Sequence, residues 1–172
     1  AVGEAKLNSD INSSTGKLTH LNTSGEASMV DISMKPDSVR IAVARAQISM
    51  NSKTLVLIET NDVQKGDVIS VARIAGIMAA KNTSQLIPLC HSLPLTKVEL
   101  QFDMDHENNL IAIEAIAKTT AKTGVEMEAL TAVSIAALTI YDMCKGVDRA
   151  MSITNVRLVK KTGGTSGDVV LE

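Results

Sequence analysis

Two lysines and one aspartate have the residue types and the spacing for proton transfer. Asp142 and Lys145 stand three residues apart near the end of a segment with helical periodicity, so their side chains can face each other. A carboxylate beside the amine orients it, and partial burial could bring the pKa of the lysine toward neutrality. Lys65 precedes Gly66 and Asp67 at the predicted start of another helix, where free backbone N–H groups favour an anion. The alternatives are a solvated ion pair and an ordinary loop.

Other candidates have equally plausible structural explanations. Thr123 followed by Glu126 predicts a capping box at the start of the long helix, and Glu128 in its first turn suits the helix dipole. His91 lies in a loop bent by two prolines, where it is either a satisfied loop residue or a phosphate ligand and proton donor. Four basic residues are solvated surface charges by default: Arg40, Arg73, Lys81 and Lys161.

The composition excludes several classes of protein. Apolar residues make up 45% of the 172 residues, which indicates a globular chain with a real core. The net charge of −2, with Phe102 and Tyr141 as the only aromatic residues, disfavours nucleic-acid binding. Cys90 and Cys144 are the only cysteines, and the three histidines are scattered, so no metal site is predicted. Two thiols suggest a reducing compartment.

Hydrophobic periodicity predicts the elements that must position these residues. Residues 40–50 alternate as a strand does, although their alanine content keeps a helix possible. Residues 97–104 and 110–119 predict two strands joined by a polar turn, that is, a hairpin. The other predicted elements are helices over 51–59, 68–80 and 125–147, a loop over 88–94 and a strand over 151–160. This order predicts an α+β, ferredoxin-like βαββαβ fold with two helices on one face of an antiparallel sheet.

The domain organisation follows from the same survey. Residues 1–17 are predicted to form a flexible tail, and residues 18–172 a single domain. The first 30 residues resemble no signal peptide, and the most apolar window, 132–140, is too short to span a bilayer. We therefore expect a soluble protein of the cytoplasm, or of the mitochondrial matrix if eukaryotic. The bare face of the sheet is expected to be covered by oligomerisation.

Several sequence strings together resemble one family. The two most specific are TGVEMEALTA at 123–132 and LTIYDMCK at 138–145. The others occur in the family's order: MVDIS (29–33), KGDV (65–68), ARIAGI (72–77), AAK (79–81), LIPLCH (86–91) and KTGG (161–164). On these strings the chain resembles the molybdenum cofactor biosynthesis protein C family, over roughly residues 18–168.

The resemblance implies a fold, an assembly and a reaction. The fold is ferredoxin-like, and the assembly is a homohexamer, a trimer of dimers, with active sites at subunit interfaces. The substrate is 3′,8-cyclo-7,8-dihydroguanosine 5′-triphosphate, and the products are cyclic pyranopterin monophosphate and pyrophosphate. No cofactor is required, although Mg²⁺ could accompany the triphosphate. No nucleic acid or membrane is implied as a partner.

The same resemblance assigns residues to roles. Lys65 and Lys145 look like the acid–base pair, and Asp142 looks like the residue that orients and charges Lys145. The substrate-binding residues it implies are His91, Glu126, Glu128, Cys90, Met127, Lys81, Arg40 and Lys161. The family often has a lysine at the position of Thr165, which leaves the role of the last glycine-rich loop open.

The spacing of two of these residues suggests a site shared between chains. Glu128 and Asp142 are 14 residues apart on one predicted helix, which separates them by about 21 Å along one stripe. They therefore come from two chains, or they bind opposite ends of a long ligand. The rival functions are an inactive small-molecule-binding module and a structural assembly protein, and turnover would discriminate among the three.

Overall fold

Alternation in β1 and β3 builds the centre of the sheet. In this computed structural model, which describes residues 25–165 and 167–172, β1 (Ser38–Ser49) pairs antiparallel with β3 (Leu110–Ala121) without a register shift. The inward side chains of β1 are small at its centre, where Ala42, Ala44 and Ala46 are buried. Small residues at these positions allow a helix to approach the sheet closely.

The complete sheet is antiparallel with the strand order β2-β3-β1-β4-β5. β2 (Leu95–Asp105) and β3 form the predicted hairpin, and Asn109 at its turn has a φ of 52°. β4 (Ser152–Thr162) lies on the other side of β1, and β5 (Val169–Val170) is a short strand beside β4 that the sequence did not predict. The order of the first four strands is that of a ferredoxin-like fold, as predicted.

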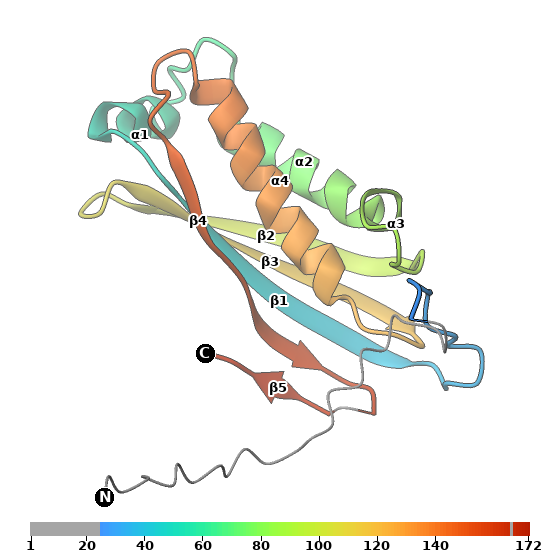
Figure 1. Ribbon diagram of the computed structural model, residues 1–172. Helices are drawn as coiled ribbons and strands as arrows, with labels where there is room; N and C mark the ends of the chain where they lie inside the picture. Colours follow the sequence, from blue (N-terminus) through green and yellow to red (C-terminus); the bar gives the residue numbers. More distant parts are fainter. Residues whose placement is uncertain (1–24, 166) are drawn as a thin grey trace, which may run out of the picture. The chain divides into compact units, whose positions relative to one another are not determined.

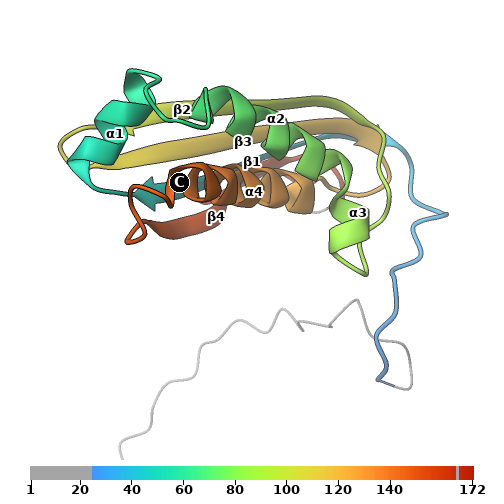
Figure 2. The same cartoon turned by 90° about the horizontal axis from the view of Figure 1, so that it is seen from above.

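Two long helices cover one face of this sheet (Figures 1 and 2). They are α2 (Val68–Lys81) and α4 (Glu126–Cys144). α1 (Ser52–Glu59) follows β1, and the four-residue α3 (Thr83–Leu86), which was not predicted, follows α2. By length and composition alone, α4 is the one described helix that could cross a membrane. Here it packs on the sheet as a core helix does.

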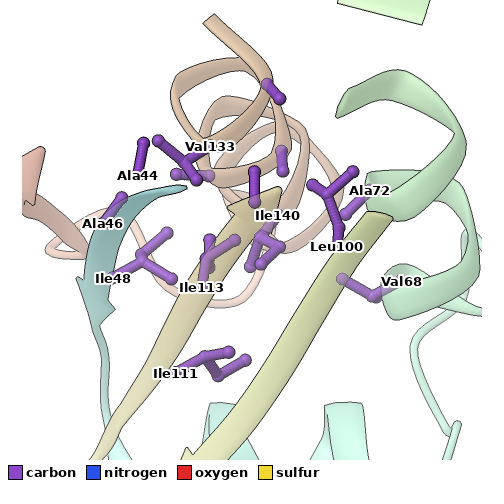
Figure 3. Close-up of a cluster of buried hydrophobic side chains, with 14 of the residues drawn as sticks. Ala44, Ala46, Ile48, Val68, Ala72, Leu100, Ile111, Ile113, Val133 and Ile140 are labelled. Carbon is purple, nitrogen blue, oxygen red and sulfur yellow. The ribbon is translucent and has the colours of Figure 1, made fainter. Parts of the chain in front are cut away.

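The core lies between α4, α2 and the sheet (Figure 3). Val133 and Ile140 of α4 are fully buried with Ile113 of β3 and Leu100 of β2. Gly76 lets α2 approach β2 and α4 closely, because a Cβ there would lie 2.5 Å from Leu100 Cδ2 and 3.0 Å from the Ala132 carbonyl oxygen.

Residues 31–172 form one compact unit, and residues 1–30 belong to a separate unit. The predicted flexible tail, residues 1–17, lies outside the described residues. The single domain over 18–172 stays a prediction.

Candidate active site

Asp142 bridges two lysines at the C-terminal end of α4. Its Oδ1 lies 2.7 Å from Lys145 Nζ, and its Oδ2 lies 3.2 Å from Lys65 Nζ. Lys65 Nζ also donates a hydrogen bond of 2.8 Å to the backbone carbonyl of Asp142. We call these three residues the lysine–aspartate cluster. The structure therefore brings together the three residues predicted to be catalytic, from segments 77 residues apart in sequence.

Local structure fixes where each lysine starts. Lys65 lies in the turn before α2, where Gly66 has a φ of 96° and donates its N–H to the Val63 carbonyl at 2.9 Å. Asp67 then caps α2 by accepting the Ser70 N–H at 2.9 Å. Lys145 ends α4 with its N–H bonded to the Tyr141 carbonyl at 2.8 Å. The backbone at both lysines is held by hydrogen bonds, so the cluster is presented by ordered elements.

The charges in this cluster stabilise one another. Hydrogen bonds from Lys145 and then Lys65 lower the pKa of Asp142, and the hydrogen bond and charge of Asp142 raise the pKa of Lys145. The idea that partial burial brings the pKa of Lys145 toward neutrality is therefore wrong for the isolated chain, where this side chain is 54% exposed. In this state Lys145 is an ammonium that can donate a proton.

A second group of predicted residues lies at the opposite end of α4. Glu126, the first residue of the helix, pairs with Lys161 of β4 at 3.2 Å between Oε1 and Nζ. Lys161 is opposite the buried Ala42 in the sheet, so its side chain projects from the same face of the sheet, the face that the helices cover. Arg40 of β1 donates from Nε to the Ala121 carbonyl at 3.4 Å and from Nη2 to the Lys122 carbonyl at 3.3 Å. We call Arg40, Glu126, Glu128 and Lys161 the N-terminal cluster.

The predicted capping box is absent. The N-cap residue of α4 is Val125, and no side chain caps it. Glu126 turns its carboxylate over Gly124 toward Lys161, and a Cβ at Gly124 would overlap that carboxylate. The ion pair has replaced the hydrogen bond back to the helix start that the spacing from Thr123 suggested.

Glu128 is a buried acid beside a thiol. It is only 4% exposed, and burial raises its pKa, with a further contribution from the charge of Glu126. Burial also raises the pKa of Cys90, and the charge of Glu128 adds to the effect. The thiol of Cys90 is therefore protonated and is not activated as a nucleophile. Asp142, 14 residues further along α4, differs from Glu128 in burial, because its side chain is 59% exposed. That the two residues share one stripe of the helix stays a prediction.

The loop that carries His91 lies near the N-terminal cluster. His91, next to Cys90, is partly buried. The loop is held by a hydrogen bond of 2.7 Å from the Thr119 hydroxyl to the Pro94 carbonyl. Met127 is exposed in the first turn of α4. Lys81 is exposed as the last residue of α2, whereas Lys65 lies in the turn before the first residue of that helix.

The structure also shows residues that the sequence did not single out. Asp148 is 3% exposed and accepts hydrogen bonds from the Asn51 N–H at 2.7 Å and the Thr54 hydroxyl at 3.2 Å, which joins the loop after α4 to α1. An aspartate shortly after a helix carries no sequence signal for this contact. Arg73, treated as a surface charge, lies with its Cζ 5.1 Å from the centroid of the Phe102 ring and donates to the Leu100 carbonyl. Within the described residues, no group of three or more His, Cys, Asp or Glu side chains could hold a metal ion.

The fold and the two clusters define a class: a ferredoxin-like α+β protein that presents paired lysines and carboxylates at both ends of its helical layer. Comparison with known proteins makes this specific. The model of the family described as "MoaC family" matches residues 29–164. The chain is 57% identical over 153 residues to the protein named "Cyclic pyranopterin monophosphate synthase" from Natranaerobius thermophilus, covering 89% of this chain and 96% of that protein. It is 59% identical over 152 residues to the protein of the same name from Syntrophomonas wolfei subsp. wolfei, covering 88% and 97%.

The chain belongs to the MoaC family, and the resemblance seen in its sequence strings is confirmed. It is an enzyme of molybdenum cofactor biosynthesis that acts on a small-molecule substrate.

Proposed function

We propose that this enzyme converts 3′,8-cyclo-7,8-dihydroguanosine 5′-triphosphate to cyclic pyranopterin monophosphate, releasing pyrophosphate as a phosphorus–oxygen lyase does. The relatives at 57% and 59% identity carry the name of this product. The observation that supports the chemistry best is the lysine–aspartate cluster, with Lys145 and Lys65 at 2.7 Å and 3.2 Å from the Asp142 carboxylate.

The reaction needs groups of this kind. Opening the purine five-membered ring and building a pyran require several proton transfers, which call for a positioned acid and base. Lys145, whose pKa is raised by Asp142, is protonated and can donate first. Lys65 contacts the same carboxylate, so when one lysine has given up its proton the other can still neutralise the charge of Asp142. Lys65 and Lys145 are the proposed acid–base pair, and Asp142 orients them.

The N-terminal cluster suits the other parts of the substrate. Closing the cyclic phosphate with loss of pyrophosphate needs positively charged groups beside the leaving pyrophosphate. Arg40 and Lys161 are proposed to supply this charge, and Lys81 is proposed as a further phosphate contact. Glu126, Glu128, Cys90, His91 and Met127 are proposed to contact the rest of the molecule. No cofactor is required in this proposal, and any Mg²⁺ would arrive with the triphosphate.

The distance between the clusters favours a site shared by two chains. The 14 residues from Glu128 to Asp142 span about 21 Å of helix. The helical layer between them exposes large apolar side chains: Val71, Ile74 and Met78 on α2, and Leu138 on α4. An apolar surface of this kind is typical of an interface. A second copy related by a two-fold axis near the middle of α4 would bring the lysine–aspartate cluster of one chain to the N-terminal cluster of the other.

We propose the dimer as the unit of a homohexamer, a trimer of dimers, in the cytoplasm or, in a eukaryote, the mitochondrial matrix. The exposed sheet face, with Arg45 paired to Glu114 at 2.7 Å, would be covered in that assembly.

Turnover of the cyclised dihydro-GTP tests the proposal. Pyrophosphate release and oxidised-pterin fluorescence would be followed for the wild type and for Lys145→Ala. We expect turnover by the wild type, with a loss of at least about a hundredfold in a variant that keeps its oligomeric state. Binding of the nucleotide without turnover by a folded wild type would contradict the proposal and leave a binding module.

A further inference from the structure

The turn after β4 packs its backbone directly against Arg40. Gly163 and Gly164 have φ values of 89° and 85°, a region that side chains other than glycine rarely adopt. A Cβ on Gly164 would overlap Nη1 and Cζ of the Arg40 guanidinium, and a Cβ on Gly163 would overlap the carbonyl oxygen of Val39. Glycine at 164 is therefore required by the place of the guanidinium as well as by the backbone.

The other two nitrogens of the guanidinium are already fixed. Nε and Nη2 donate to the carbonyls of Ala121 and Lys122 at the end of β3. Nη1, the nitrogen against Gly164, has no acceptor among the described residues. A planar guanidinium with two of its nitrogens bonded and its Nη1 end packed against a backbone can point the third nitrogen in one direction only.

The turn is held in place as a unit. The Gly163 N–H donates to Asp168 Oδ1 at 3.0 Å, and the Gly167 N–H donates to the Gly164 carbonyl at 3.1 Å. Just beyond it, β5 pairs with β4, with Val170 opposite Lys160. Gly164 therefore faces Arg40 from a hydrogen-bonded turn. If a side chain were added at Gly164, the turn could move away from Arg40 only by breaking these hydrogen bonds.

We propose that Gly164 is a positioning residue for Arg40, which it holds ready to bind the phosphate groups of the substrate. This inference rests on the proposed function, in which Arg40 contacts phosphate. An arginine that is free to rotate loses side-chain entropy when it binds, whereas one held in place loses less. Because Gly164 acts through Arg40, which is proposed to bind phosphate and to transfer no proton, Gly164 is expected to set affinity for the triphosphate and to leave the proton-transfer steps unchanged.

A double-mutant cycle tests this with Gly164→Ala, Arg40→Ala and the double variant. Gly167→Ala is the matched control, because Gly167 also has a positive φ, 66°, but no atom lies within 4 Å of the position of its Cβ. Affinity for inorganic tripolyphosphate would be measured by calorimetry, and KM and kcat by turnover of the cyclised nucleotide. Thermal melting would compare the folding of all variants.

We expect Gly164→Ala and Arg40→Ala each to weaken tripolyphosphate binding about tenfold, the scale of one charge-assisted hydrogen bond. In the Arg40→Ala background, Gly164→Ala should cost less than about twofold more, because the group it acts through is gone. Its effect on melting should also shrink there to that of Gly167→Ala, since removal of the guanidinium makes room for the Cβ. KM should rise and kcat should change little.

Additive losses in the double variant would overturn the proposal, and so would a Gly164→Ala protein that binds tripolyphosphate as Gly167→Ala does. A wild type that does not bind tripolyphosphate would also overturn it. A wild type that binds tripolyphosphate with the expected coupling but does not turn over the cyclised nucleotide would instead refute the proposed function and leave the positioning role of Gly164 standing.

Discussion

Mixing two inactive variants should restore activity if each site takes one cluster from each of two chains. Glu128→Ala damages the N-terminal cluster, and Lys145→Ala damages the lysine–aspartate cluster at the other end of α4. The two positions are separated by 17 residues, or about 26 Å of helix, so one chain cannot bring them to one small region of substrate. Each variant alone should be inactive, because every site in it lacks one cluster.

The expected recovery follows from counting intact sites. After an equal mixture is unfolded and refolded together, a site needs its lysine–aspartate cluster from a Glu128→Ala chain and its N-terminal cluster from a Lys145→Ala chain. Each occurs for half of the chains, so about a quarter of the sites should be intact and about a quarter of the wild-type activity should return. This fraction is the same for a dimer and for a hexamer assembled at random from the two chains.

Turnover per chain would be measured after mass spectrometry has verified mixed oligomers. The matched control is a mixture of Lys145→Ala with Asp142→Ala, in which every chain lacks a working lysine–aspartate cluster and no activity should return. No recovery in verified mixed oligomers of the first pair would refute the two-chain site, and it would favour a long ligand that spans both ends of one chain.

Three further predictions follow from charges and packing. Asp142→Asn removes the hydrogen bond and the charge that raise the pKa of Lys145, so the alkaline limb of kcat/KM should move to lower pH, and an unmoved limb would remove Lys145 from that limb. Burial raises the pKa of Glu128, so the folded protein favours the protonated carboxyl. Relative to Glu128→Gln, the wild type should therefore lose free energy of unfolding as the pH rises from below the ordinary glutamate pKa, about 4.3, through the raised pKa. Urea unfolding of both proteins at about pH 4 and pH 8 measures this, and the same difference at both pH values would show that the buried carboxyl is not responsible. Gly76→Val should lower the free energy of unfolding by at least about 1–3 kcal/mol, because its side chain would meet Leu100 and the carbonyl of Ala132, and an unchanged urea midpoint would contradict the close approach of α2 and α4.

The fold was largely predictable because its elements bury one face each. Alternation at 40–50 and the helical period at 68–80 both come from side chains that meet the same core, so both segments show a period, although the alanines of 40–50 left a helix possible there. The two elements that the sequence did not predict are short. α3 has four residues and β5 has two, and neither is long enough to show a period. β5 exists because β4 offers it an edge, which is a tertiary effect.

The site was predictable in its residues but less so in its contacts. The resemblance to a family named Lys65, Asp142 and Lys145, and the structure brings them together. Spacing alone suggested that Thr123 caps α4, yet Glu126 pairs with Lys161, 35 residues away in sequence. A local sequence pattern on a helix cannot reveal a partner that comes from a distant strand. The register of β4 in the sheet places Lys161 beside Glu126.

The pKa of Lys145 shows a second limit of sequence reasoning. A lysine beside an aspartate is compatible with either direction of shift, because burial lowers the pKa of a lysine and the carboxylate raises it. The single chain exposes Lys145, so the carboxylate dominates and the pKa is raised. The direction is decided by what covers the end of α4, which the sequence of one chain does not contain.

The separation of the two clusters has a simple origin in the sheet. β1 and β3 have twelve residues each, and a helix that covers them must run along much of their length, which α4 does with 19 residues, or about 28 Å. Residues at its two ends therefore stand near opposite ends of the sheet, whatever their chemistry. The turn before α2 brings Lys65 to one end, and β1 and β4 bring Arg40 and Lys161 to the other. If these residues act as proposed, as acid–base and phosphate-binding groups on one molecule, they must meet either through a second chain or across a ligand long enough to span α4, and the mixing experiment distinguishes these two outcomes.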